Sequence, residues 1–232
     1  MRTPIPQYME SQTKKEVTVQ RVDHLPKIGA ENGFLDIDPI WNDPDNAELK
    51  ALRKDPCILA EGDVVFLPEK VEEKKLEPVP TDLKHRFLLK GKRPQLRIVL
   101  KSTSDKPISG LEVELSVGTP PERLITDASG LLAKTIARTS TEGQLQFKLE
   151  TPEVEINAPL FIGGLQPVHT IVGISLRLNN LGYNVGEVDN SDSEFSRRFK
   201  SAVEEFQCDH ELTVDGIPGP KTQKELEKQH GC

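Results

Sequence analysis

The sequence predicts a multidomain α+β protein whose three parts differ in secondary structure. The hydrophobic periodicity changes along the 232 residues, and a charged, proline-bearing segment at 69–83 has no apolar face. Hydrophobic residues make up 35% and aromatic residues 5%, which is lean for one large core but sufficient for several small ones. We expect a flexible N-terminus at 1–16, a small βααβ domain at 17–68, a linker at 69–83, a β-sandwich at 84–162 and an all-α domain at 168–232.

The N-terminal domain is predicted from two short strands that enclose two helices. Residues 17–20 alternate like a strand, and residues 25–34 form a helical candidate closed by Gly33, because glycine tolerates the left-handed conformation after a helix. A second helical candidate covers 44–54. Residues 63–68 read as the closing strand, which ends at a proline that cannot donate to a longer ladder.

The middle segment carries short β-type runs separated by Gly, Pro, Ser and Asp, at the spacing of a small sandwich or barrel. These runs are 85–90, 95–100, 111–117, 131–137, 144–150 and 154–158. The turn at 126–130 supplies Asp127 and Ser129 for side-chain bonds and Gly130 for a positive φ.

Beyond Pro167 the apolar spacing becomes helical, and three helices are expected. Two stripes have spacings of three and four residues. The first comprises Ile171, Ile174, Leu178 and Leu181, and the second comprises Phe195, Phe199, Val203 and Phe206. A third helix fits 220–229, where Pro220 suits the first turn because its missing N–H is not needed there.

The C-terminal segment resembles the bacterial peptidoglycan-binding domain, a three-helix module often attached to cell-wall hydrolases. The resemblance rests on ISLRLNNLGY (174–183), AVEEFQ (202–207) and, above all, LTVDGIPGPKTQKEL (212–226). The first half-repeat, VDNSDSEFSRRF (188–199), departs from the family because it lacks the Asp-Gly…Gly-Pro-x-Thr pattern. Phe199 stands where a threonine is common.

This resemblance directs attention to four candidate binding residues. Asn179, Asn180 and Tyr183 lie at a helix end, where amide and aromatic groups can meet a sugar or a stem peptide. The alternative is a capping amide pair beside a partly buried tyrosine. Asp215 is the fourth candidate, and turn chemistry with Gly216 accounts for it equally well.

Residues 17–68 resemble a LysM domain, a βααβ module that binds glycans containing N-acetylglucosamine. The matching residues are VTVQ (17–20), Asp23-His24-Leu25, Ile28, Gly33-Phe34, Trp41-Asn42 and EGDVVFLP (61–68). The usual Gly-Asp-Thr opening is replaced by Val22-Asp23-His24, and a charged insertion follows Trp41. Trp41, the only tryptophan, is a candidate for stacking on a sugar, and a core position is the alternative.

The middle segment is similar in strand spacing and in its 126–130 turn to transthyretin-like and carboxypeptidase-regulatory-like sandwiches. The order of the three domains resembles accessory proteins of type VI secretion and contractile-injection clusters. That architecture implies protein partners in a secretion or phage-tail-like machine.

Several function classes are disfavoured by the residues. The net charge of −7 argues against a nucleic-acid partner, and no apolar run approaches the ~20 residues that cross a bilayer. The three cysteines and five histidines match no metal-site spacing, and phosphate-binding glycine loops are absent. The terminal QHGC echoes an L,D-transpeptidase motif but lacks its serine and arginine, so we expect neither enzymatic activity nor a cofactor.

Two interpretations of the basic run at 84–101 stay open, namely a face for an anionic polymer and a solvated sheet face. The main hypothesis is a non-catalytic protein that binds the glycan or stem peptide of the bacterial cell wall. A structural adaptor for secretion or tail proteins is the alternative, and a wall hydrolase is a third. Residues 1–20 lack the apolar stretch of a secretory signal. We therefore expect cytoplasmic synthesis, with action at the wall or periplasm if a secretion machine delivers the protein.

Overall fold

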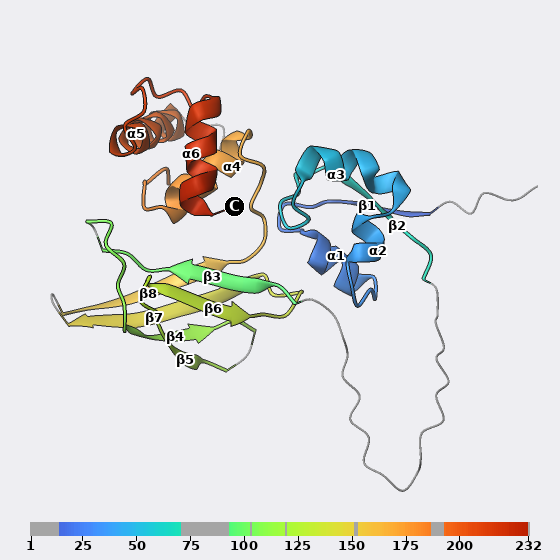
Figure 1. The fold of residues 1–232 in the computed structure, drawn as a ribbon, viewed down its shortest axis with the longest axis horizontal. Coiled ribbons are helices and arrows are strands. Elements are labelled where there is room, and N and C mark those ends of the chain that lie inside the picture. The colour runs from blue at the N-terminus through green and yellow to red at the C-terminus, as the bar shows by residue number, and fades with distance from the viewer. Residues whose placement is uncertain are drawn as a thin grey trace, which may run out of the picture.

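The buried hydrophobic residues of the protein fall into three separate clusters, one in each of three units along the chain. The structure is a computed structural model, and it describes residues 14–70, 93–102, 104–118, 120–150, 153–186 and 193–231. We call 14–70 the N-terminal unit, 93–162 the β unit and 165–231 the C-terminal unit. Figure 1 shows two units that contain helices and one made of strands.

In the N-terminal unit the helices lie between two strands in chain order, and the two strands pair antiparallel with each other. Strand β1 (Lys15–Thr18) pairs with β2 (Val64–Leu67), and Lys15 lies opposite Leu67. Between them come α1 (Leu25–Glu31), α2 (Asp38–Trp41), the 3-10 helix η1 (Pro44–Asn46) and α3 (Ala47–Arg53). The expected helix at 44–54 is thus divided in two, and α2 had no sequence prediction. Asp43 caps η1, because its side chain accepts a hydrogen bond from the Asp45 N–H.

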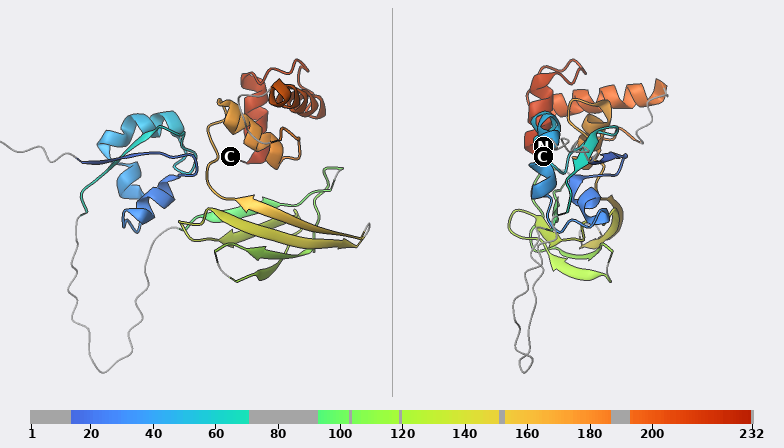
Figure 2. Two further views of the ribbon diagram at one scale, coloured as in Figure 1. Left: turned by 180° about the vertical axis from the view of Figure 1, so that it is seen from behind. Right: turned by 90° about the vertical axis from the view of Figure 1, so that its right-hand side faces the viewer.

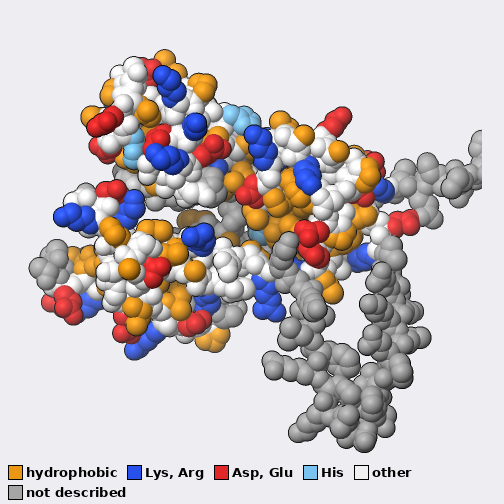
Figure 3. All heavy atoms as spheres, in the orientation of Figure 1, with side chains coloured by type: hydrophobic (Ala, Val, Ile, Leu, Met, Phe, Trp, Pro, Cys, Tyr) orange, Lys and Arg blue, Asp and Glu red, His pale blue; other side chains and the backbone are white. Residues whose placement is uncertain are grey.

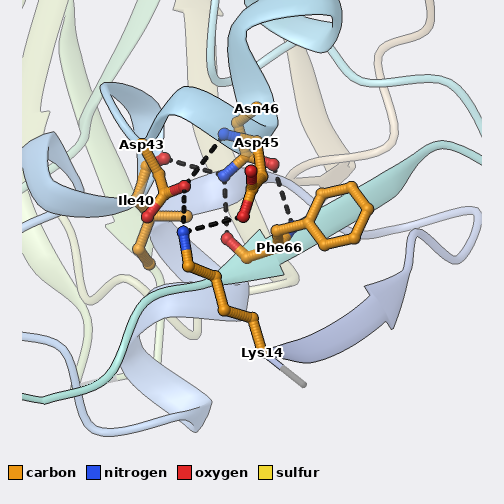
Figure 4. A network of polar contacts seen from close by, with 6 residues as sticks. All are labelled: Lys14, Ile40, Asp43, Asp45, Asn46 and Phe66. Atoms are coloured by element: carbon orange, nitrogen blue, oxygen red, sulfur yellow. Dashed lines mark hydrogen bonds and ion pairs between the residues drawn. The ribbon is translucent and has the colours of Figure 1, made fainter. Parts of the chain in front are cut away.

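Asn46 explains why the helix at 44–54 is divided, because its side chain ties α2 to β2. Asn46 is 1% exposed, and its Nδ2 donates to the carbonyl oxygens of Ile40 and Phe66, both at 2.8 Å. Its Oδ1 accepts from the Phe66 N–H at 2.9 Å (Figure 4). Beside it, Lys14 Nζ lies 2.7 Å from the carboxylates of both Asp43 and Asp45. These contacts fix the backbone at the junction between η1 and α3.

The β unit consists of two sheets that share one hydrophobic cluster. Strand β3 (Gln95–Val99) pairs antiparallel with β6 (Leu131–Thr135). The second sheet has the order β5-β4-β7-β8 and is antiparallel throughout. Its strands are β4 (Glu112–Ser116), β5 (Glu122–Ile125), β7 (Glu142–Glu150) and β8 (Glu153–Phe161). The shared cluster includes Val113, Leu115, Leu132 and Leu145, with Leu96 and Ile98 packed against it.

The sequence expectations for this unit are met at most strands and at the turn. Asp127 Oδ1 accepts from the Ser129 and Leu131 N–H groups at 2.7 and 2.9 Å. Gly130 has φ +75°, and a Cβ there would come within 2.5 Å of the Leu100 carbonyl oxygen. Strand β5 had no prediction, β8 extends beyond the expected 154–158, and the run at 85–90 lies outside the described residues.

The C-terminal unit has the three expected helices. They are α4 (Ile171–Asn180), α5 (Ser193–Asp209) and α6 (Pro220–His230). The two predicted stripes supply much of the core, which includes Ile174, Leu178, Phe195, Val203, Phe206 and Leu226. Thr170 begins α4 by accepting from the Gly173 N–H at 2.9 Å. Within the described part of the chain, no helix combines the length and apolar character that crossing a membrane requires.

We predict that Asn46→Ala destabilises the N-terminal unit by about 3 kcal/mol, because it leaves buried backbone groups of Ile40 and Phe66 unpaired. Denaturant unfolding followed by circular dichroism measures this loss. Asn42→Ala is the matched control, because Asn42 is exposed and its amide donates to the Asp38 carbonyl oxygen at the surface. Equal destabilisation by the two variants would contradict the role given to Asn46.

Candidate binding face of the C-terminal unit

The turn before α6 is organised by the buried amide of Gln207 on α5. Gln207 is 1% exposed, and its Oε1 accepts from the N–H groups of Asp215 and Gly216 at 3.0 and 2.9 Å. Its Nε2 lies within hydrogen-bond distance of Asp215 Oδ1, the Ile217 carbonyl oxygen and Thr222 Oγ1. One side chain therefore holds the turn and the first turn of α6 against α5.

Asp215, a candidate binding residue, is engaged within this turn. Its Oδ1 accepts from the Ile217 N–H at 2.8 Å as well as from Gln207. The Ile217 bond, and then the Gln207 bond, hold the pKa of the Asp215 carboxyl below its ordinary value. Gly216 follows with φ +69°, and a Cβ there would lie 2.7 Å from Lys200 Cγ. Turn geometry thus accounts for both residues.

Asn179 closes the loop that follows α4. Its Nδ2 donates to the Gly186 carbonyl oxygen, and its Oδ1 accepts from the Val185 N–H, both at 2.9 Å. Both ends of the amide are therefore committed to backbone. Val185 is fully buried by this arrangement.

The remaining two candidates of this unit lie at the surface and link α4 to the ends of the other helices. Asn180 is exposed, and its Nδ2 lies 3.0 Å from His230 Nε2 at the end of α6. The Tyr183 hydroxyl donates to Asp209 Oδ2 at 2.9 Å at the end of α5. The structure thus brings Asn180 and Tyr183 to one region where three helices end. Figure 3 shows histidine, acidic and basic side chains at the surface of this unit.

His210 and Glu225, which are both half-buried, extend this region between α5 and α6. The Phe206 ring contacts the Tyr183 ring edge-on at 5.5 Å and lies 4.4 Å from the His210 ring. His210 Nδ1 in turn lies 4.0 Å from Glu225 Oε1. We define the polar face as Asn180, Tyr183, Asp209, His210, Glu225 and His230. Four members of this face were not predicted as site residues, because nothing in their spacing signals that the helix ends converge. These are Asp209, His210, Glu225 and His230.

The protonation states of Tyr183 and Glu225 give the polar face both a hydrogen-bond donor and a hydrogen-bond acceptor. Burial, and then the bond to Asp209, raise the pKa of the Tyr183 hydroxyl, so it keeps its proton. The bonds from Lys228 and Gln229 lower the pKa of Glu225, so it is a carboxylate at neutral pH. An aromatic edge flanked by hydroxyl, amide, imidazole and carboxylate groups suits the hydroxyl and amide groups of a sugar or peptide.

Trp41, the candidate from the N-terminal unit, is a core residue there. It is 9% exposed and packs with Leu25, Ile40 and Val65. Its ring thus supports the fold of its own unit and does not belong to the polar face. In the portion of the chain that the structure describes, no group of three or more His, Cys, Asp or Glu side chains is placed to hold a metal ion.

Comparison with known families gives one match. Residues 174–226 match the family described as a putative peptidoglycan binding domain, and the match extends from α4 to Leu226 in α6. Neither the curated proteins nor the solved structures gave a match to this chain. The match supports a C-terminal peptidoglycan-binding domain, and it includes Asn180, Tyr183, Asp209, His210 and Glu225 of the polar face.

We predict that Gln207→Leu destabilises the C-terminal unit by about 3 kcal/mol, because the N–H groups of Asp215 and Gly216 lose their buried acceptor. Loss of helical circular dichroism on heating measures the effect. Gln223→Leu is the control, because the half-buried Gln223 amide donates to the Pro218 carbonyl oxygen alone. If both variants melt at the temperature of the parent protein, Gln207 does not hold the turn.

Proposed function

We propose that this protein is a non-catalytic binder of bacterial peptidoglycan and that the polar face is its contact surface. The observation that carries the proposal is the family match over 174–226, which extends from α4 through α5 into α6 and covers every member of the face except His230. The available donors and acceptors suit the hydroxyl and amide groups of a glycan or a stem peptide. Such binding uses hydrogen bonds and ring contacts and needs no cofactor.

Of the candidate residues in this unit, we propose Asn180 and Tyr183 as ligand contacts. Asn179 and Asp215 are not proposed as contacts. Asn180 is exposed and its partner is another side chain, His230, which a ligand can replace. The Tyr183 hydroxyl likewise bonds to a side chain, Asp209, at the surface. Asn179 and Asp215 instead bond backbone groups that need them, so they shape the domain.

The N-terminal unit is proposed as a second, LysM-like wall module. The supporting observation is its arrangement of helices between the antiparallel strands β1 and β2. A second weak site on the same chain raises the apparent affinity through effective concentration, provided that both modules reach the polymer together. Because Trp41 is a core residue, any sugar contact of this unit uses other side chains.

A structural adaptor is the second candidate function. It is favoured by the observation that every member of the polar face already has a partner within the face, so the face is complete without a ligand. The adaptor would hold protein components of a secretion or tail-like machine. If such a machine delivers the chain, its place of action is the wall or periplasm, and otherwise it is the cytoplasm.

Co-sedimentation of the full chain with purified sacculi tests the wall-binding proposal. We expect the double variant Asn180→Ala/His230→Ala to bind about tenfold more weakly, since two lost hydrogen bonds contribute roughly 1.4 kcal/mol. The control is Gln144→Ala/Asn157→Ala, which removes an exposed amide pair from β7 and β8 at the same cost in hydrogen bonds. A folded parent protein that stays in the supernatant would favour the adaptor.

The same sacculi test the proposed absence of catalysis. We expect no release of soluble muropeptides during prolonged incubation with the wild-type chain, and no difference for Cys232→Ser. A cysteine nucleophile requires a base and an oxyanion site held on a scaffold, and Gln229 stands in QHGC where the transpeptidase motif has a serine. Release by the wild type that Cys232→Ser abolishes would overturn the non-enzyme proposal.

A further inference from the structure

The connector between β8 and α4 lies directly against the N-terminal unit. A Cβ added at Gly163 would come within 2.9 Å of the Val22 carbonyl oxygen and of His24 Cδ2. A Cβ added at Gly164 would come within 2.9 Å of the Arg21 carbonyl oxygen. Both glycines have positive φ, +83° and +74°, so the backbone approaches as only glycine allows. In Figures 1 and 2 this connector runs beside the N-terminal unit.

A second contact of the N-terminal unit is with the β unit itself and comes from a different loop. Arg138, which follows β6, donates from Nη1 to the Phe34 carbonyl oxygen at 3.2 Å. Phe34 lies beyond α1, whereas the first contact involves the turn between β1 and α1. Two contacts at two separate places fix an orientation, which one contact does not.

His24 lies at the centre of the first contact and also begins α1. It is 5% exposed, and its Nδ1 accepts from the Lys27 N–H at 3.3 Å. That role requires an unprotonated Nδ1, because a protonated imidazole has no acceptor. The charged groups around the ring are Asp23, Lys27 and Glu31, and the two connector glycines contribute none. Lys27 is itself paired with both carboxylates, at 2.6 and 3.1 Å.

We propose that His24 and the Gly163–Gly164 connector form a latch, which docks the N-terminal unit on the β unit and opens when His24 is protonated. Protonation removes the helix cap and places a positive charge in the closed contact beside glycine backbone that cannot neutralise it. Protonation of His24 is therefore less favourable in the docked state than in the open state. The proposal does not depend on wall binding, because it concerns the arrangement of two units of one chain.

The direction of the pH dependence follows from the burial of His24. Burial, and then the Lys27 ammonium, lower the pKa of His24 from its ordinary value of 6.5. A solvated His24 in the open state binds a proton near pH 6.5, whereas the docked one does not. Docking is consequently at full strength above pH 6.5 and weakens as the pH falls below it. Neutral pH keeps the latch closed, and acid opens it.

Distances between spin labels test the latch in the full chain. One label is placed on exposed Cys57 of the N-terminal unit and the other on Lys148→Cys of β7, with Cys208 and Cys232 replaced by serine. Double electron–electron resonance is expected to give one narrow distance at pH 7.5 and a broad, longer distribution at pH 5. Gly164→Val is expected to give the broad distribution at both pH values.

Two matched variants separate the latch from simpler effects. Gly110→Val strains a positive φ of +72° in the β unit, with nothing within 4 Å of its Cβ, and is expected to stay narrow at pH 7.5. His24→Asn keeps a capping oxygen but cannot titrate, and is expected to stay narrow at both pH values. Equal distributions for Gly164→Val and Gly110→Val at pH 7.5 would overturn the docking contact. Acid opening that persists in His24→Asn would overturn the role of His24.

Arg138→Ala tests the docking independently of Gly164→Val, because it removes a side-chain contact without straining the backbone. The test therefore holds even if Gly164→Val misfolds. We expect it to widen the distance distribution at pH 7.5 while helical circular dichroism stays at the parent value. An unchanged distribution would contradict the two-contact dock.

Discussion

The buried amide of Gln207 is the interaction on which the C-terminal unit depends. Three helices of this length bury little apolar area, so the path of the chain between them needs a specific polar constraint. Gln207 supplies it by bonding both the N–H groups and the carboxylate of the turn at 215–217. The neighbouring Phe206, Asp209 and His210 belong to the same end of α5. The end of α5 therefore both orders this turn and contributes Asp209 and His210 to the polar face.

Asn46 performs a comparable role in the N-terminal unit, where it joins α2 to β2. Both residues are 1% exposed, and both bond backbone groups that lie outside their own helix. An apolar side chain at either place would fill the space but leave the backbone groups unpaired. The N-terminal and C-terminal units thus each combine a hydrophobic cluster with a buried, hydrogen-bonded amide, which selects a single arrangement of their loops.

The extent to which the sequence predicts this structure differs between periodic and polar features. Apolar spacing located α4, α5 and most strands, because burial of one face imposes a period that is visible in the residues. Turn chemistry located 126–130 for a similar local reason. In strand β5 only Leu124 is half-buried and the other three residues are exposed, so its sequence shows no buried face. Helix α2 has four residues, little more than one turn, so no helical period is visible in it. The proposed LysM-like and sandwich identities of the first two units stay predictions.

The candidate site was predictable only in part. Asn180 and Tyr183 were found because a helix end with amide and aromatic groups is visible in one segment. Their partners His230 and Asp209 come from other helices, so no local pattern indicates them. Gln207 did carry a signal, since it follows Val203 by four residues and so continues the apolar stripe of α5. A polar residue on a buried stripe requires partners, and here those partners form the turn that precedes α6.

The two contacts of the N-terminal unit bear on how two wall modules would act together. Avidity depends on whether the spacing of the modules matches the spacing of sites on the polymer. A docked unit is held beside the connector that leads into the C-terminal unit, so the spacing of the two modules is more restricted than in an undocked chain. The docked state gains more from a polymer whose repeat fits that spacing and less from any other. His24 sets the balance between the two states. Its protonation therefore weakens the preference for one polymer repeat and widens the range of spacings that the two modules can span, without altering a residue of the polar face.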